Sequence, residues 1–110
     1  PVHSAMRAAM NASMTRPLTI HEIEAFARDG VVMLPQMFSL GWVELLRRGF
    51  DKNLKVPTPR GRVWDRDSEG RTMFWDNRAW REIEEYRQFV TGSPAAEIAG
   101  RIMGATKVNF

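Results

Sequence analysis

The stretch Phe74-Trp75-Asp76-Asn77-Arg78 brings together the side-chain types that hold a small organic molecule. Its two aromatic rings could flank an apolar group, while the amide and the guanidinium beside them could hydrogen-bond a carboxylate. The same side-chain types have commoner structural uses, in which the rings fill a core, the amide caps a helix and the guanidinium is a solvated charge. The candidate substrate-binding residues are therefore Phe74, Trp75, Asn77 and Arg78, with core packing, capping and solvation as the competing interpretation.

Two further arginines precede this stretch. Arg60 and Arg62 lie in the segment 56–62, which holds two prolines and a glycine and is therefore predicted to be a loop. Their charges could neutralise a phosphate or a carboxylate on a ligand. Arginines in such a loop are more often simply exposed to solvent, so both interpretations stay open.

The chain offers no recognisable set of catalytic or metal-binding residues. It has no cysteine, which excludes disulfides, thiolate zinc sites and cysteine nucleophiles. A reducing compartment is then favoured, and we expect a cytoplasmic protein. Neither His3 nor His21 has a carboxylate two residues further on, as a His-x-Asp metal pair requires. No Ser-His-Asp set, phosphate-cradling glycine loop or zinc spacing occurs, so we predict no catalytic residue, metal ligand or cofactor bound by this chain alone.

Composition predicts one globular domain. The 110 residues are 44% hydrophobic and 26% charged, with a formal net charge of +3. Basic and acidic residues alternate, as in Asp65-Arg66-Asp67, which indicates a solvated surface and not a nucleic-acid-binding face. No apolar stretch approaches the length that spans a bilayer. We therefore expect neither a nucleic acid nor a membrane as partner.

Most of the chain is predicted to be helical. Thr19 and Glu22 form a capping-box pattern that begins a helix, and Asp29-Gly30 ends it. Ser39 is the predicted cap of a second helix, whose apolar face runs to Leu54. Two more helices are predicted, one capped by Asn77 and ending at Thr91-Gly92, the other beginning at Ser93-Pro94 and ending at Gly104.

Short strands are predicted between these helices. Val31–Leu34 is a β-rich run that Pro35 closes. The segments 62–64 and 71–75 would form a hairpin around a polar turn, with an ordered loop as the alternative. The last residues, 107–110, alternate polar with apolar like a strand that is just beginning. Such a strand needs a sheet to pair with, so a chain of this pattern would normally continue into a β-rich core.

The first seventeen residues differ from the rest. They contain no acidic residue and end at Pro17, and Met6, Met10 and Met14 recur four residues apart. We predict a mobile N-terminal extension over 1–17, with a frayed amphipathic helix in it, and an ordered domain over 18–110.

The chain contains, in this order, the segments Leu18-Thr-x-x-Glu22, Asp29-Gly30-Val-Val-x-Leu34-Pro35, Gly61-Arg62-Val63, Phe74-Trp75-Asp76-Asn77, Ser93-Pro94-x-Ala96-Glu97-Ile98-Ala99 and Met103-Gly104-x-x-Lys107-Val108-Asn109-Phe110. Together these segments resemble the phytanoyl-CoA dioxygenase family, although no single one is specific. The resemblance runs from about Leu18 to the last residue.

The resemblance implies a fold and an activity. Members of that family are non-haem Fe(II)- and 2-oxoglutarate-dependent oxygenases built on a double-stranded β-helix, or jelly roll, whose iron is held by a His-x-Asp pair and a distant His. It implies that residues 74–78 lie near the mouth of the substrate pocket, and that His-x-Asp follows shortly after a strand like 107–110. We therefore expect an α+β fold over 18–110: the mainly helical N-terminal part of a dioxygenase, truncated before its iron-binding motif and not catalytic by itself.

Other functions stay open. The apolar faces of the predicted helices exceed what they can cover among themselves, so the chain could self-associate through them. The alternative function is a non-catalytic helical protein-interaction module that binds a partner through these faces. A small helical DNA-binding domain is disfavoured because the helices lack a basic face. The resemblance implies a small-molecule substrate but does not identify it, nor does it separate hydroxylation from halogenation. It also implies that Trp64 and Trp80 fill the junction between these helices and the jelly roll.

Overall fold

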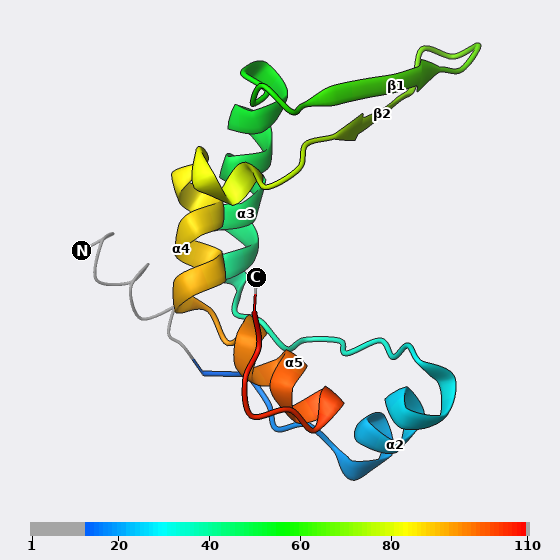
Figure 1. The fold of residues 1–110 in the computed structure, drawn as a ribbon, viewed down its shortest axis with the longest axis vertical. Coiled ribbons are helices and arrows are strands. Elements are labelled where there is room, and N and C mark those ends of the chain that lie inside the picture. The colour runs from blue at the N-terminus through cyan, green and yellow to red at the C-terminus, as the bar shows by residue number, and fades with distance from the viewer. Residues whose placement is uncertain (1–12, 110) are drawn as a thin grey trace.

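Four α-helices, one 3₁₀ turn and a two-stranded antiparallel sheet make up the described residues, 13–109, of the computed structural model. The expected α+β class, mainly helical, is confirmed. Figure 1 shows α3 and α4 side by side, α2 and α5 together at one end, and the strands extending from the other end. The elements are α2 (Ile20–Asp29), α3 (Leu40–Lys55), β1 (Arg62–Arg66), β2 (Thr72–Trp75), η1 (Ala79–Arg81), α4 (Glu84–Gly92) and α5 (Ala95–Met103).

Helix α2 has the ends that its sequence predicts. The Thr19 hydroxyl accepts a hydrogen bond from the Glu22 backbone N–H at 3.2 Å, and the Glu22 carboxylate accepts one from the Thr19 backbone N–H at 3.0 Å. Gly30 ends the helix in the left-handed conformation, with φ of 74°, and its N–H bonds the Phe26 carbonyl at 2.8 Å. The capping box and the glycine stop are both confirmed, because each depends only on residues within one turn.

Helices α3 and α4 pack closely through a glycine. A Cβ atom on Gly49 would lie 3.0 Å from the Cβ of Glu85 and 2.9 Å from the Tyr86 ring, so only a glycine allows this approach. Beyond it, the buried Trp42 meets the Phe89 ring edge-on, with ring centroids 6.0 Å apart. Ser39 occupies the predicted cap position of α3, although its side chain makes no capping hydrogen bond.

A hydrophobic cluster joins α2, α5 and the loop between α2 and α3. Its buried members are Met37, Ile98 and Ile102. The partly buried side chains packed against them are Met14, Leu18, Ile23, Phe26, Val32, Leu34 and Phe38. The Phe38 ring also contacts Phe89 of α4, at 5.3 Å between centroids, and so connects this cluster to the α3–α4 pair.

The predicted strand at Val31–Leu34 is wrong. The segment is extended but belongs to no sheet, since β1 and β2 pair only with each other in the described residues. The alternating burial typical of a strand is present: Val32 and Leu34 are half-buried against the cluster, while Val31 and Met33 are exposed. What is missing is a neighbouring strand, and period-two burial by itself does not supply one.

The helix predicted after Asn77 is shorter than expected. Arg78, not Asn77, holds the N-cap position, in a left-handed conformation with φ of 56°. A 3₁₀ turn, η1, follows, and α4 begins only at Glu84 because Ile83 is extended. The predicted end at Gly92 is confirmed.

Two other expectations concern the chain ends. Residues 107–109 form no strand, which contradicts the predicted strand as far as the described residues reach; Phe110 lies outside them, as does the predicted helix around Met6 and Met10. Within the predicted extension, the Thr15 N–H bonds the Met37 carbonyl at 3.1 Å and Arg16 bonds the Pro35 carbonyl at 2.9 Å. Ordered contacts therefore begin before Leu18.

The described chain is open in shape. Its Cα radius of gyration is 16.4 Å, whereas a compact domain of this length would have about 13 Å. The predicted hairpin is confirmed, and it extends away from the helices (Figure 1). No described helix combines the length and apolar character needed to cross a membrane.

Candidate functional site

The base of the hairpin is held by a polar network. The Asp76 carboxylate accepts hydrogen bonds from the Thr58 backbone N–H, at 2.8 Å, and from the Thr58 hydroxyl. Arg60 donates from Nε to the Asn77 carbonyl at 2.7 Å and from Nη2 to both Glu82 carboxylate oxygens, at 2.7 and 2.9 Å. These hydrogen bonds to Glu82 raise the pKa of Arg60 above its ordinary value. These bonds fix the loop before β1 against the turn after β2.

Arg60 is therefore not simply exposed to solvent, because its guanidinium is ion-paired with Glu82. Arg62 differs: its Nη1 donates to the neighbouring Gly61 carbonyl at 3.0 Å, and among the described side chains it forms no ion pair. Of the two arginines, Arg62 is the one whose charge is free to meet a ligand.

Register decides which hairpin side chains share a face. Arg62 pairs with Trp75, Val63 with Phe74 and Trp64 with Met73. Because side chains alternate across a strand, Arg62, Trp64, Met73 and Trp75 share one face. Phe74 points to the other face, where its ring meets Phe50 of α3 edge-on at 6.5 Å.

A hollow of about 280 Å³ opens on the first face. It is lined by Pro59, Arg60, Arg62, Trp64, Trp75 and Asn77. The structure thus brings together two of the four predicted site residues, Trp75 and Asn77. Phe74 instead packs against α3, and Arg78 does not line the hollow; its side chain is exposed. Sequence reasoning did not place Trp64 beside Trp75, and the only available signal was the pairing register of the hairpin.

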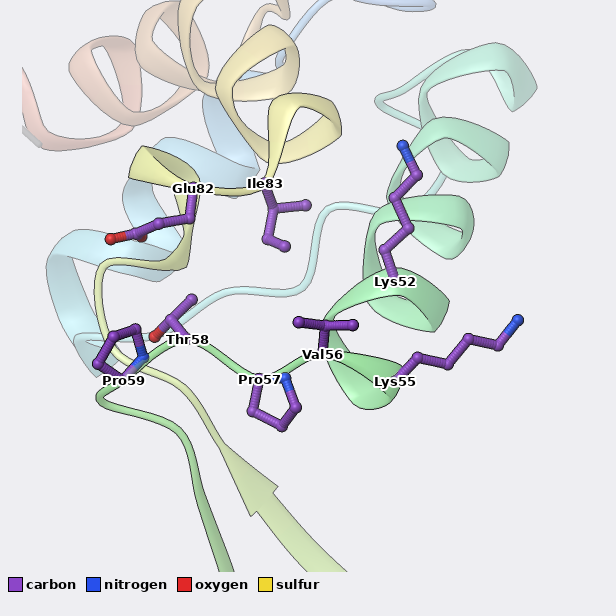
Figure 2. Close-up of a pocket in the computed structure, with 8 residues that line it drawn as sticks. All are labelled: Lys52, Lys55, Val56, Pro57, Thr58, Pro59, Glu82 and Ile83. Carbon is purple, nitrogen blue, oxygen red and sulfur yellow. The ribbon is translucent and has the colours of Figure 1, made fainter.

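A larger hollow, about 480 Å³, lies between the end of α3 and η1 (Figure 2). Its wall is apolar at Val56, Pro57 and Ile83, and its polar groups are mostly engaged elsewhere. The Thr58 hydroxyl bonds Asp76, Glu82 bonds Arg60, and Lys52 bonds Glu85. Lys52 in turn holds the pKa of the Glu85 carboxyl below its ordinary value. This hollow therefore offers fewer free groups to a ligand than the one on the hairpin.

No known protein family, curated protein or solved structure matches this chain.

The described residues hold no ligand set for the iron that the resemblance implies. Among residues 13–109, no three His, Cys, Asp or Glu side chains lie together as a metal site would need. His21 is on the first turn of α2, with its side chain 91% exposed, and its nearest carboxylate is Glu24 at 3.9 Å.

Proposed function

We propose that residues 18–110 form the helical N-terminal part of a cytoplasmic non-haem Fe(II)- and 2-oxoglutarate-dependent dioxygenase of the phytanoyl-CoA dioxygenase type, which acts on a small molecule. In this proposal the chain covers one side of a jelly roll and contributes Trp75 and Asn77 to the rim of the substrate pocket. It supplies no iron ligand.

The amount of exposed apolar surface carries the proposal. Twelve large apolar side chains in the described residues are at least 45% exposed, and they lie on every element except η1 and α4 and in the loops after α2 and α3, whereas only seven hydrophobic residues are buried. Large exposed apolar surfaces on a folded chain mark a surface that another structure covers. The exposed residues are Ile20, Val31, Met33, Leu40, Phe50, Leu54, Val56, Val63, Trp64, Met73, Trp75 and Met103.

The hairpin supports the same proposal. Strands β1 and β2 have four or five residues each and pair with no other described strand. An isolated hairpin of this size is marginally stable in water, and its outer edges expose unpaired backbone groups. Docking on a β-rich structure would satisfy those groups and cover the apolar side chains that lie outside the hairpin hollow.

The first test is the coding sequence downstream of the Phe110 codon. A His-x-Asp motif shortly after it supports a hydroxylase, His-x-Gly supports a halogenase, and the absence of both overturns the proposal. The protein so encoded, given Fe(II), 2-oxoglutarate and a panel of organic acids, should release succinate only when its substrate is present. Replacing the first histidine of that motif by alanine is the control, since it should abolish turnover without changing the fold.

The exposed apolar surface also fits the second candidate, a helical module that binds another protein. A stable, monodisperse species of residues 1–110 in analytical ultracentrifugation would favour that module. Aggregation, or self-association that hides the apolar side chains, would favour the dioxygenase part.

A further inference from the structure

Two tryptophans, Trp64 and Trp75, line the hairpin hollow. Trp64 and Trp75 are diagonal neighbours on paired strands, which places such side chains about 7–8 Å apart. A planar ring stacked between two indoles needs about the same spacing, twice the carbon–carbon contact of about 3.5–4.0 Å. The structure records no contact between these two described rings, and they are 50% and 56% exposed. The slot between them is therefore not filled by the tryptophans themselves.

The same hollow has one uncompensated positive charge. Arg62 lies directly opposite Trp75 in the hairpin and forms no ion pair among the described side chains, in contrast to Arg60, which Glu82 neutralises. The exposed Asn77 side chain adds an amide to the rim. A guanidinium and an amide next to a ring slot suit a carboxylate or phosphate attached to the ring.

We propose that this hollow binds a small planar aromatic compound with one anionic group, its ring between Trp64 and Trp75 and its anion on Arg62. A volume of about 280 Å³ suits one or two fused rings and not a long acyl chain. The single slot also disfavours a nucleic-acid strand, which needs successive stacking positions. The inference rests on the proposed function only in taking Trp75 and Asn77 as substrate contacts; binding itself needs no iron and no turnover.

The experiment is a calorimetric titration of the 110-residue chain, in the absence of metal, with four probes. Naphthalene-2-carboxylate and adenosine 5′-monophosphate carry a ring and an anion, and naphthalene-2-carboxamide and adenosine are their uncharged counterparts. We expect each anion to bind about tenfold more tightly than its uncharged counterpart. Stronger binding of the naphthalene pair would identify a carboxylate ligand, and stronger binding of the adenosine pair a phosphate ligand. No binding by either anion, or equal binding within each pair, overturns the proposal.

Substitutions locate the site. Trp64→Ala and Trp75→Ala should each weaken binding about tenfold, whereas Trp64→Phe and Trp75→Phe, which keep a flat ring and protect the hairpin, should stay within about threefold. Arg62→Gln should abolish the preference for the anions and leave the uncharged probes unaffected. Val63→Ala, on the opposite hairpin face, and Arg47→Gln, on α3, are matched controls that should bind like the parent chain. Equal losses in the controls would place binding elsewhere and overturn the proposal, and a failed succinate assay with intact binding would refute only the dioxygenase.

Discussion

Apolar side chains are buried in the α2–α5 cluster but largely exposed on the β1–β2 hairpin. In the cluster, Met37 is 2% exposed and Ile98 and Ile102 are 8% exposed, because two helices and a loop surround them. On the hairpin, Met73 is 64% exposed and Trp75 56%, because only one strand lies beside each of them. Residues of similar hydrophobicity thus contribute to folding in one region and present surface to a partner in the other.

The two regions also differ in the hydrogen bonds and ion pairs that hold them in place. The cluster region combines a local ion pair, Arg16–Glu22 at 2.7 Å beside the α2 cap, with long-range bonds from Thr15 and Arg16 to the 35–37 loop. The hairpin is fastened at its base by Asp76 and Arg60, which bond groups seventeen or more residues away in the sequence. The hairpin's position therefore depends on a few long-range bonds, and its outer face stays free.

The largest expected effect on stability distinguishes a buried methionine of the cluster from an exposed one on the hairpin. Met37→Ala should lower the free energy of unfolding by about 3 kcal/mol, because it removes buried atoms and leaves a cavity. Met73→Ala should change it by less than about 0.5 kcal/mol, because the side chain is already in water. Urea unfolding followed by circular dichroism measures both. Similar losses for the two would mean that the hairpin face is covered in solution, and the contrast between the regions would fail.

The base of the hairpin is the next place to test. Asp76→Ala leaves the buried Thr58 N–H and hydroxyl without their acceptor, and we expect a loss of about 2 kcal/mol. In Asp76→Ala, amide hydrogen exchange should accelerate relative to the parent chain, and it should do so more in β1 and β2 than in α2 and α5. Asp51→Ala, at an exposed position on α3, serves as control and should stay within about 0.5 kcal/mol. Uniform acceleration across all elements would show that the hairpin is not a separately fastened unit.

A smaller effect, this time a gain in stability, should come from replacing Arg78, whose backbone is left-handed just after the hairpin. Glycine adopts this conformation without the side-chain clash, so Arg78→Gly should stabilise the chain by about 0.5–1 kcal/mol after the greater flexibility of the unfolded chain is counted. Arg78→Ala removes the guanidinium but keeps the strain, and should leave thermal stability unchanged. A loss of stability in both variants would show that the exposed guanidinium has a structural role.

The smallest effect concerns pH and belongs to the cluster region. Hydrogen bonds from Arg16 and Thr19 lower the pKa of Glu22 from 4.5 to about 2. A depressed carboxyl pKa stabilises the fold fully above pH 4.5, and that stabilisation is lost as the pH falls through about 2. The thermal midpoint of the parent chain should therefore fall more between pH 5 and pH 2 than that of Glu22→Gln. Parallel curves for the two proteins would show that the ion pair does not form in solution.

The predictability of the candidate site was uneven. The stretch from Phe74 to Arg78 was identified from its residue types, and the structure places Trp75 and Asn77 beside one hollow. It separates Phe74 from them because adjacent residues of a strand face opposite ways. The diagonal placement of Trp64 beside Trp75 and the neutralisation of Arg60 by Glu82 depend on contacts across turns, which local patterns do not encode.

Local patterns in the sequence are enough to predict the capping box of α2, the glycine stops, the helical faces and the turn between β1 and β2. These features depend on interactions within a few residues, whose energies are the same wherever the segment lies. Only the tertiary structure decided that 31–34 joins no sheet, that Gly49 lets α3 and α4 meet, and which hairpin face carries the open slot. Strand pairing, close helix approach and register each need a partner distant in the sequence, and that partner is chosen by the packing of the whole chain.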